Sequence, residues 1–146
     1  MKETAEEAVM HTRDLYQAYD GKGGGRISIW FAIRQVMTCS RDLIAMVRDA
    51  AAELNTGIHA HLCEHKDEVS FCLQNYHLRP AQFLESMGVL GPNLLTAHNV
   101  MLSDEDIAIM ARRDVKVSIV PEPICPIMDF QNTADSSGRP KCGPWL

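Results

Sequence analysis

The side chains best suited to chemistry in this sequence gather between residues 59 and 65. The segment reads His59-Ala60-His61-Leu62-Cys63-Glu64-His65. Because side chains alternate between the two faces of a strand, His59 and His61 are expected on one face, with Glu64 in the turn that follows. An imidazole that binds a metal, next to a carboxylate that carries protons, is a common arrangement for activating water. In the alternative reading, one histidine packs in the core and the others are solvated.

His98 is the second candidate, one strand and one helix further along the chain. Alone, it would be a structural histidine at the end of the apolar segment 93–97. Together with the first cluster it favours a shared site, because the carboxyl ends of parallel strands meet at one edge of a sheet. His11 and His77 have no such placement and are expected at the surface, and His65 is expected to cap or flank a helix.

The elements that must position these residues alternate along the chain. The pattern predicts helices at 6–19, 40–54, 66–76, 79–88 and 103–113, and strands at 26–33, 57–62, 93–97 and 115–120. This alternation is typical of parallel βα units, with helices on both faces of an open sheet or around a barrel. An eight-stranded barrel needs about 250 residues, so there is room for about half of one. We expect a domain at 1–120 and an irregular tail at 121–146.

Composition excludes several classes of protein. The chain of 146 residues is 46% hydrophobic, which is too apolar for disorder, and it contains no run near the ~20 apolar residues of a membrane helix. Its net charge is −5 and its basic residues are scattered, which predicts no nucleic-acid partner. Five cysteines without a C-x-x-C pair predict neither a zinc ribbon nor a disulfide framework, but mostly small buried side chains. The N-terminus is acidic, unlike a secretory signal, so we expect a cytoplasmic protein without a membrane partner.

Two motifs carry a resemblance to a known family. Residues 57–64 read Gly-Ile-His-Ala-His-Leu-Cys-Glu, and residues 94–107 read Leu-Leu-Thr-Ala-His-Asn-Val-Met-Leu-Ser-Asp-Glu-Asp-Ile. At this spacing they resemble the metal-dependent amidohydrolase superfamily, in the branch of cytosine/guanine deaminases, adenosylhomocysteine deaminases and triazine chlorohydrolases. The resemblance covers about residues 1–117. It implies an α/β fold, namely part of a (β/α)8 TIM-type barrel with about four parallel βα units.

The resemblance also implies the chemistry and the residues that carry it. One divalent metal, zinc or iron, would activate water for hydrolysis of a non-peptide carbon–nitrogen bond, most simply deamination of a small nucleobase- or nucleoside-like heterocycle. By position in the motifs, His61 is a metal ligand, Glu64 protonates the ring nitrogen and shuttles a proton, and His98 orients the attacking water. Met101 departs from the motif, since many members have a histidine there.

Two further family features have no counterpart in this chain: the H-x-H of the first strand and the aspartate that ends the eighth. We therefore expect an internal fragment that binds its metal weakly. From Ser118 onward, synonymous codons read with a one-base shift give His-Cys-Pro-Arg-Ala-Asn, which resembles the family segment after strand seven, so we expect the tail to be a frameshift product. The alternatives are an inert half-barrel that serves as a binding or assembly module, and an unrelated α/β domain with chance histidines. The sequence does not decide whether the chain forms a homo-oligomer.

Overall fold

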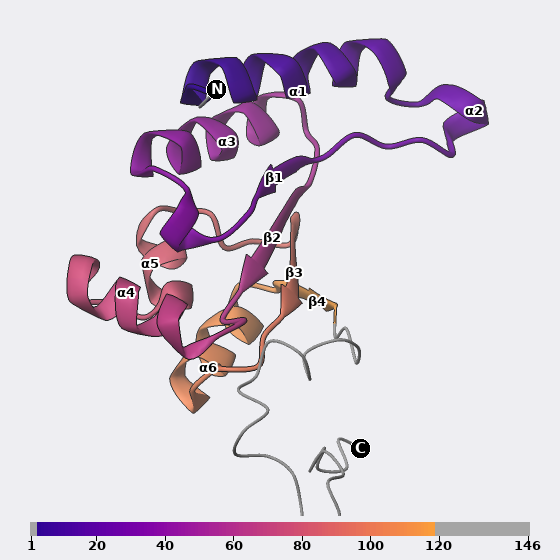
Figure 1. Cartoon of the computed structure of the whole chain (residues 1–146). Helices are drawn as coiled ribbons and strands as arrows, with labels where there is room; N and C mark the ends of the chain where they lie inside the picture. Colours follow the sequence, from indigo (N-terminus) through magenta and orange to yellow (C-terminus); the bar gives the residue numbers. More distant parts are fainter. Residues whose placement is uncertain (1–2, 119–146) are drawn as a thin grey trace, which may run out of the picture.

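A single parallel sheet organises the chain in the computed structural model, which describes residues 3–118 (Figure 1). Its strand order is β1-β2-β3-β4, and every neighbouring pair is parallel. The strands are β1 (Phe31–Ile33), β2 (Ile58–Leu62), β3 (Leu94–His98) and β4 (Lys116–Ser118). The helices are α1 (Ala5–Tyr19), α2 (Lys22–Gly25), α3 (Arg41–Glu53), α4 (Lys66–Tyr76), α5 (Pro80–Ser86) and α6 (Asp104–Arg112), with a 3-10 turn at Val36–Thr38. The predicted α/β class with four parallel strands is confirmed.

Within residues 3–118 the helices lie on one face of the sheet (Figure 1). Along β2 the residues Ile58, Ala60 and Leu62 are fully buried against the helices, whereas His59 and His61 between them are only partly buried. A sheet covered on one face by the helices that connect its parallel strands is a barrel segment, not an open sheet with helices on both faces. The structure therefore supports the partial barrel over the open sheet.

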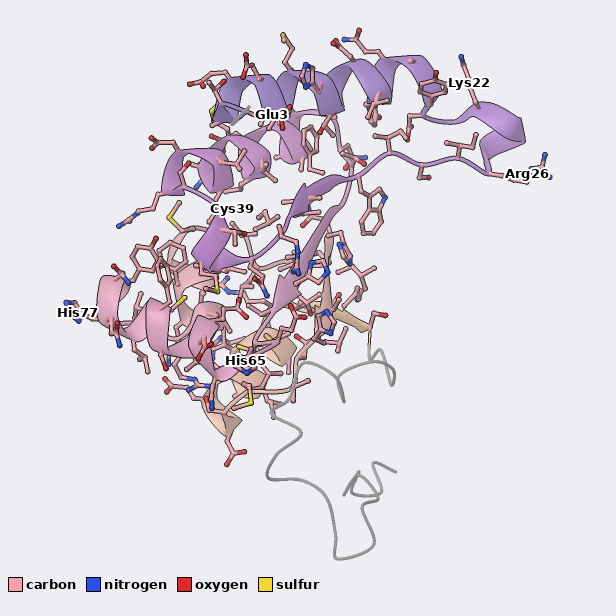
Figure 2. The ribbon with its side chains drawn as sticks, viewed as in Figure 1. Glu3, Lys22, Arg26, Cys39, His65 and His77 are labelled. Carbon is pink, nitrogen blue, oxygen red and sulfur yellow. The ribbon has the colours of Figure 1, made fainter. Side chains whose placement is uncertain are left out.

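Helix ends follow the capping residues in the sequence. Ser40 caps α3, and Ser103 forms a capping box with Asp106 at the start of α6. His65 caps α4, as expected, by accepting a hydrogen bond from the Asp67 backbone N–H. His77 ends the same helix and points away from the sheet, which confirms its surface position (Figure 2). These local signals explain why the helix predictions are accurate to within one or two residues.

The strand predicted at 26–33 is wrong in its first half. β1 begins only at Phe31, whose backbone N–H donates to the carbonyl oxygen of Gly57, just before β2 starts. In the described part of the chain, pairing with β2 begins only at Phe31, opposite Ile58, so residues 26–30 have no strand beside them and do not form one. The preceding glycines end α1 as expected, but they also form the short element α2, in which Gly23 and Gly24 have left-handed φ angles.

The core lies between the sheet and the helices. It includes the α3 residues Val47, Ala50 and Ala51, and also Cys63 and Cys72, which behave as the predicted small buried side chains. Cys125 and Cys142, the end of the strand predicted at 115–120 and the tail predicted at 121–146 lie outside the described residues. Among the helices within 3–118, none combines the length and apolar character needed to cross a membrane.

Candidate active site

The carboxyl ends of β2 and β3 bring His61, Glu64 and His98 together. The rings of His61 and His98 stack with their centroids 5.2 Å apart and their planes at 27°. His98 Nε2 lies 3.7 Å from Glu64 Oε1. The ring of His59 lies on the same face as that of His61, with the centroids 5.3 Å apart. The cluster expected at this edge of the sheet therefore exists as a group of neighbouring side chains.

A left-handed backbone places His98 in this group. In the sheet register His98 lies beside Leu62, whose side chain faces the helices. Simple alternation would therefore direct His98 into the core as well. Its φ of 72° breaks the alternation, and the ring stacks on His61 at the opposite face of the sheet instead. Such a φ is uncommon for histidine, and unusual backbone angles of this kind concentrate at functional sites.

Glu64 is positioned by the turn after β2 and by two side chains that follow β1. Its carboxylate is only 9% exposed. Oε2 accepts a hydrogen bond from Gln35 Nε2 at 2.5 Å and lies 3.4 Å from Arg34 Nη1. Arg34 and Gln35 were not among the predicted site residues. The signal was available, since both follow a strand in the same way as the residues that were singled out.

The surroundings of His61 favour its neutral form. Burial lowers the pKa of His61 below its usual range, and the positive charge of Arg34 and the neighbouring His98 lower it further. Its Nδ1 is buried and has no hydrogen-bond partner among the described residues, and the same holds for Nδ1 of His98. A neutral imidazole with an unengaged nitrogen is the form that binds a metal.

The described residues fit a metal only in part. His61 has the chemistry of one ligand, but no group of three His, Cys, Asp or Glu side chains within 3–118 is placed to hold an ion. Catalytic zinc takes three protein ligands as a rule. His65 does not add to the set, because its ring caps α4. Residues 3–118 alone therefore do not make a complete metal site.

Comparison with known proteins agrees with the motifs. The sequence pattern of the amidohydrolase family matches residues 2–142. This chain belongs to the amidohydrolase family. It is 39% identical over 116 residues to a 5'-deoxyadenosine deaminase of Methanobrevibacter smithii, and 37% identical over 117 residues to a 5-methylthioadenosine/S-adenosylhomocysteine deaminase of Desulfitobacterium hafniense. Each match covers 80% of this chain but only 27% of the relative, so the chain spans about a quarter of these proteins.

Solved structures agree on the fold of this amidohydrolase chain. A triazine hydrolase from Arthobacter aurescens superimposes with a TM-score of 0.80 at 22% identity, over 86% of this chain and 28% of its own. An adenosine deaminase from Xanthomonas campestris with bound zinc superimposes with a TM-score of 0.75 at 26% identity, over 80% of this chain and 26% of its own. The four-stranded unit is thus a recurring part of larger structures, which is consistent with a partial barrel.

Proposed function

We propose that this chain contributes the centre of a metal-dependent amidohydrolase that deaminates a nucleobase- or nucleoside-like heterocycle. The observation that carries the proposal is the convergence of Glu64 and His98 beside His61 at the carboxyl ends of adjacent parallel strands. Relatives whose names specify deamination of adenosine derivatives support this class of substrate. The alternative is an inert half-barrel that serves as a binding or assembly module.

In this proposal His61 is one ligand of a divalent ion, zinc or iron. When bound, the ion supplies Lewis-acid activation of water. Burial keeps His61 neutral and therefore able to donate a lone pair. Because the described residues offer no three-ligand group, this chain alone is expected to bind zinc weakly.

Glu64 is proposed as the proton carrier. Gln35 Nε2 donates to Oε2, so this oxygen is engaged as an acceptor, and Oε1, on the side of His98, is the oxygen available to take up and deliver a proton. Delivery to a ring nitrogen makes the amino-bearing carbon more electrophilic. A proton taken from the attacking water and passed by Glu64 to the amino nitrogen would then let this group leave as ammonia. His98, next to Oε1, is proposed to orient the attacking water. Positioned proton transfer of this kind contributes about 10²–10⁴-fold in rate.

The test is a chimera in which residues 3–118 replace the matching segment of the Methanobrevibacter smithii deaminase. With zinc or iron added, the chimera should release ammonia from 5'-deoxyadenosine. Glu64→Gln should lower kcat by about 10²–10⁴-fold, because glutamine cannot carry the proton. His61→Asn should remove metal and activity together. His59→Asn is the matched control, since His59 lies on the same face but one step further from the edge, and it should keep most of the activity.

The 146-residue chain alone is expected to show no turnover and to bind zinc weakly in calorimetry. A folded chimera that binds metal but remains inactive would favour the inert module. Activity of the chimera that survives Glu64→Gln would contradict the role assigned to this carboxylate.

A further inference from the structure

Glu68 is a buried carboxylate that the proposed reaction does not use. It lies in the first turn of α4 and is completely buried. Within residues 3–118 no Lys, Arg or His nitrogen lies within 4 Å of it, and its Oε1 has no hydrogen-bond partner there. Burial raises its pKa to about 7. Burying such a group without a countercharge costs stability, which calls for another explanation of its presence.

The carboxylate of Glu68 contacts the backbone of the candidate proton carrier. Oε2 of Glu68 accepts from the backbone N–H of Glu64 at 3.0 Å. This contact lies directly after Cys63, whose φ of 52° is uncommon for a residue with a side chain. A strained turn persists only where its surroundings over-determine it. The carboxylate of Glu68 provides one such restraint from beneath the turn.

We propose that Glu68 is a positioning residue: by holding the backbone N–H of Glu64, it fixes the turn that places the Glu64 carboxylate beside His98. The importance of Glu64 in this statement rests on the proposed function, whereas the restraint on the turn does not.

A second buried carboxylate holds the neighbouring loop in the same way. Asp106, completely buried in the first turn of α6, accepts from Arg79 Nε at 2.6 Å, and Arg79 Nη2 donates to the carbonyl oxygen of Met101 at 2.5 Å. The backbone N–H of Met101 in turn donates to the carbonyl oxygen of Cys63 at 2.9 Å. The two loops are therefore one hydrogen-bonded unit, with Glu68 at one end and Asp106 at the other.

The geometry at Glu64 shows why the turn must be held. The Glu64 carboxylate is shared between Gln35, from the loop after β1, and His98, from the end of β3. A backbone shift of about 1 Å would break the 2.5 Å contact with Gln35, and misplacement on this scale can cost about 10²-fold in rate. A restraint at the Glu64 backbone therefore acts on the position of the carboxylate without touching it.

Hydrogen exchange of the Glu64 amide in the 146-residue chain tests the proposal, and it needs neither metal nor turnover. Glu68→Leu removes the acceptor and should speed exchange of the Glu64 amide by roughly tenfold, the loss of one hydrogen bond to a charged group. Glu68→Gln keeps an acceptor oxygen at the same distance and should restore most of the protection. Cys72→Ala is the matched control: Cys72 is buried one turn further along α4, so its truncation weakens packing but leaves the acceptor of the Glu64 amide in place.

The expected result is loss of protection confined to the Glu64 turn in Glu68→Leu, recovery in Glu68→Gln, and no local change in Cys72→Ala. Unchanged protection of Glu64 in Glu68→Leu would overturn the proposal. So would a uniform rise in exchange across β2 and β3 matching that of Cys72→Ala, because Glu68 would then be only a packing residue. If the chimera described above is inactive while the local loss is observed, the function fails and the positioning role stands.

Discussion

The sheet differs between the amino ends of its strands, here called the amino edge, and their carboxyl ends, the carboxyl edge. At the amino edge, hydrogen bonds join neighbouring segments: Thr56 Oγ1 donates to the Ile29 carbonyl oxygen at 2.7 Å, and the Tyr16 hydroxyl donates to the Leu54 carbonyl oxygen at 3.1 Å. At the carboxyl edge, polar atoms remain unengaged. Five buried side-chain atoms within 3–118 have no partner: three belong to His61, His98 and Asn99 near the ends of β2 and β3, and two to Glu68 and Asp106 in the first turns of the helices that follow these strands.

Backbone strain follows the same division. Left-handed residues before β2 and β4 are Asn55 and Asp114, types that tolerate this conformation. After β2 and β3 they are Cys63, His98 and Asn99, of which Cys63 is a type that rarely adopts it. Unengaged polar atoms and the strained angle of Cys63 thus lie near the candidate catalytic side chains. Stabilising contacts at the amino edge and a candidate site at the carboxyl edge match the way parallel α/β barrels separate stability from function.

The largest effect is expected from a substitution at the carboxyl edge. Asp106→Ala leaves the three-quarters-buried Arg79 without its anion and removes the capping box of α6. We expect a loss of about 3 kcal/mol in the free energy of unfolding, measured by urea denaturation. Asp104→Ala, at an exposed position in the same turn of α6, is the control and should cost much less. Equal losses in the two variants would show that the buried pair contributes nothing.

A second prediction tests the stability cost of Glu68 through pH. Burial, together with the negative charge of Glu64, raises its pKa to about 7, while the backbone N–H groups of Glu64 and Cys63 and the charge of Arg34 act in the opposite direction. Between pH 4.5 and 7 the folded chain therefore binds more protons than the unfolded chain, so stability falls as pH rises, by up to about 3 kcal/mol.

The measurement is the free energy of unfolding across this pH range, compared with Glu68→Gln, which cannot titrate. The variant should lack most of the decline. Parallel pH profiles for the two proteins would contradict the assignment of the decline to Glu68.

The smallest expected effect sharpens the picture of the amino edge. A Cβ at Gly57 would lie 2.3–2.5 Å from ring atoms of Trp30, so Gly57→Ala must displace that ring. Overpacking of this kind costs about 1–3 kcal/mol, and the lower part of the range is expected because the exposed Trp30 can yield. The cost is measured by thermal unfolding of Gly57→Ala alone and of Gly57→Ala combined with Trp30→Ala. Removing the Trp30 ring should recover much of the stability that Gly57→Ala loses. In Gly57→Ala the exchange rate of the Glu64 amide should be unchanged. A change there would mean that the two edges are coupled.

The elements of this chain were largely predictable from local patterns. Ser40 and Ser103 mark helix starts through side-chain hydrogen bonds that need no distant partner, and the alternation in 57–62 places His59 and His61 on one face. The strand predicted at 26–33 failed because pairing depends on how far the neighbouring strand extends, which the segment itself does not encode.

The candidate site divides in the same manner. His61, Glu64 and His98 could be singled out from residue type and spacing, because their chemistry and their place after strands are written in the sequence. The contact of Gln35 with Glu64 could not be predicted, because the two residues are 29 positions apart in the chain. Nor could the restraint from Glu68 be recognised, since a glutamate in the first turn of a helix is ordinarily a solvated charge that favours the helix dipole.

By itself, then, the sequence determined the order of strands and helices and the family, and it indicated the candidate site residues, all of which depend on neighbours along the chain. The tertiary structure decided which polar groups are buried and which backbone angles are forced. Glu68 is completely buried and His98 has a φ of 72° at the edge where the parallel strands and the helices that follow them meet. Burial and backbone strain are tertiary properties, because both arise from atoms that are distant in sequence and adjacent only in the fold.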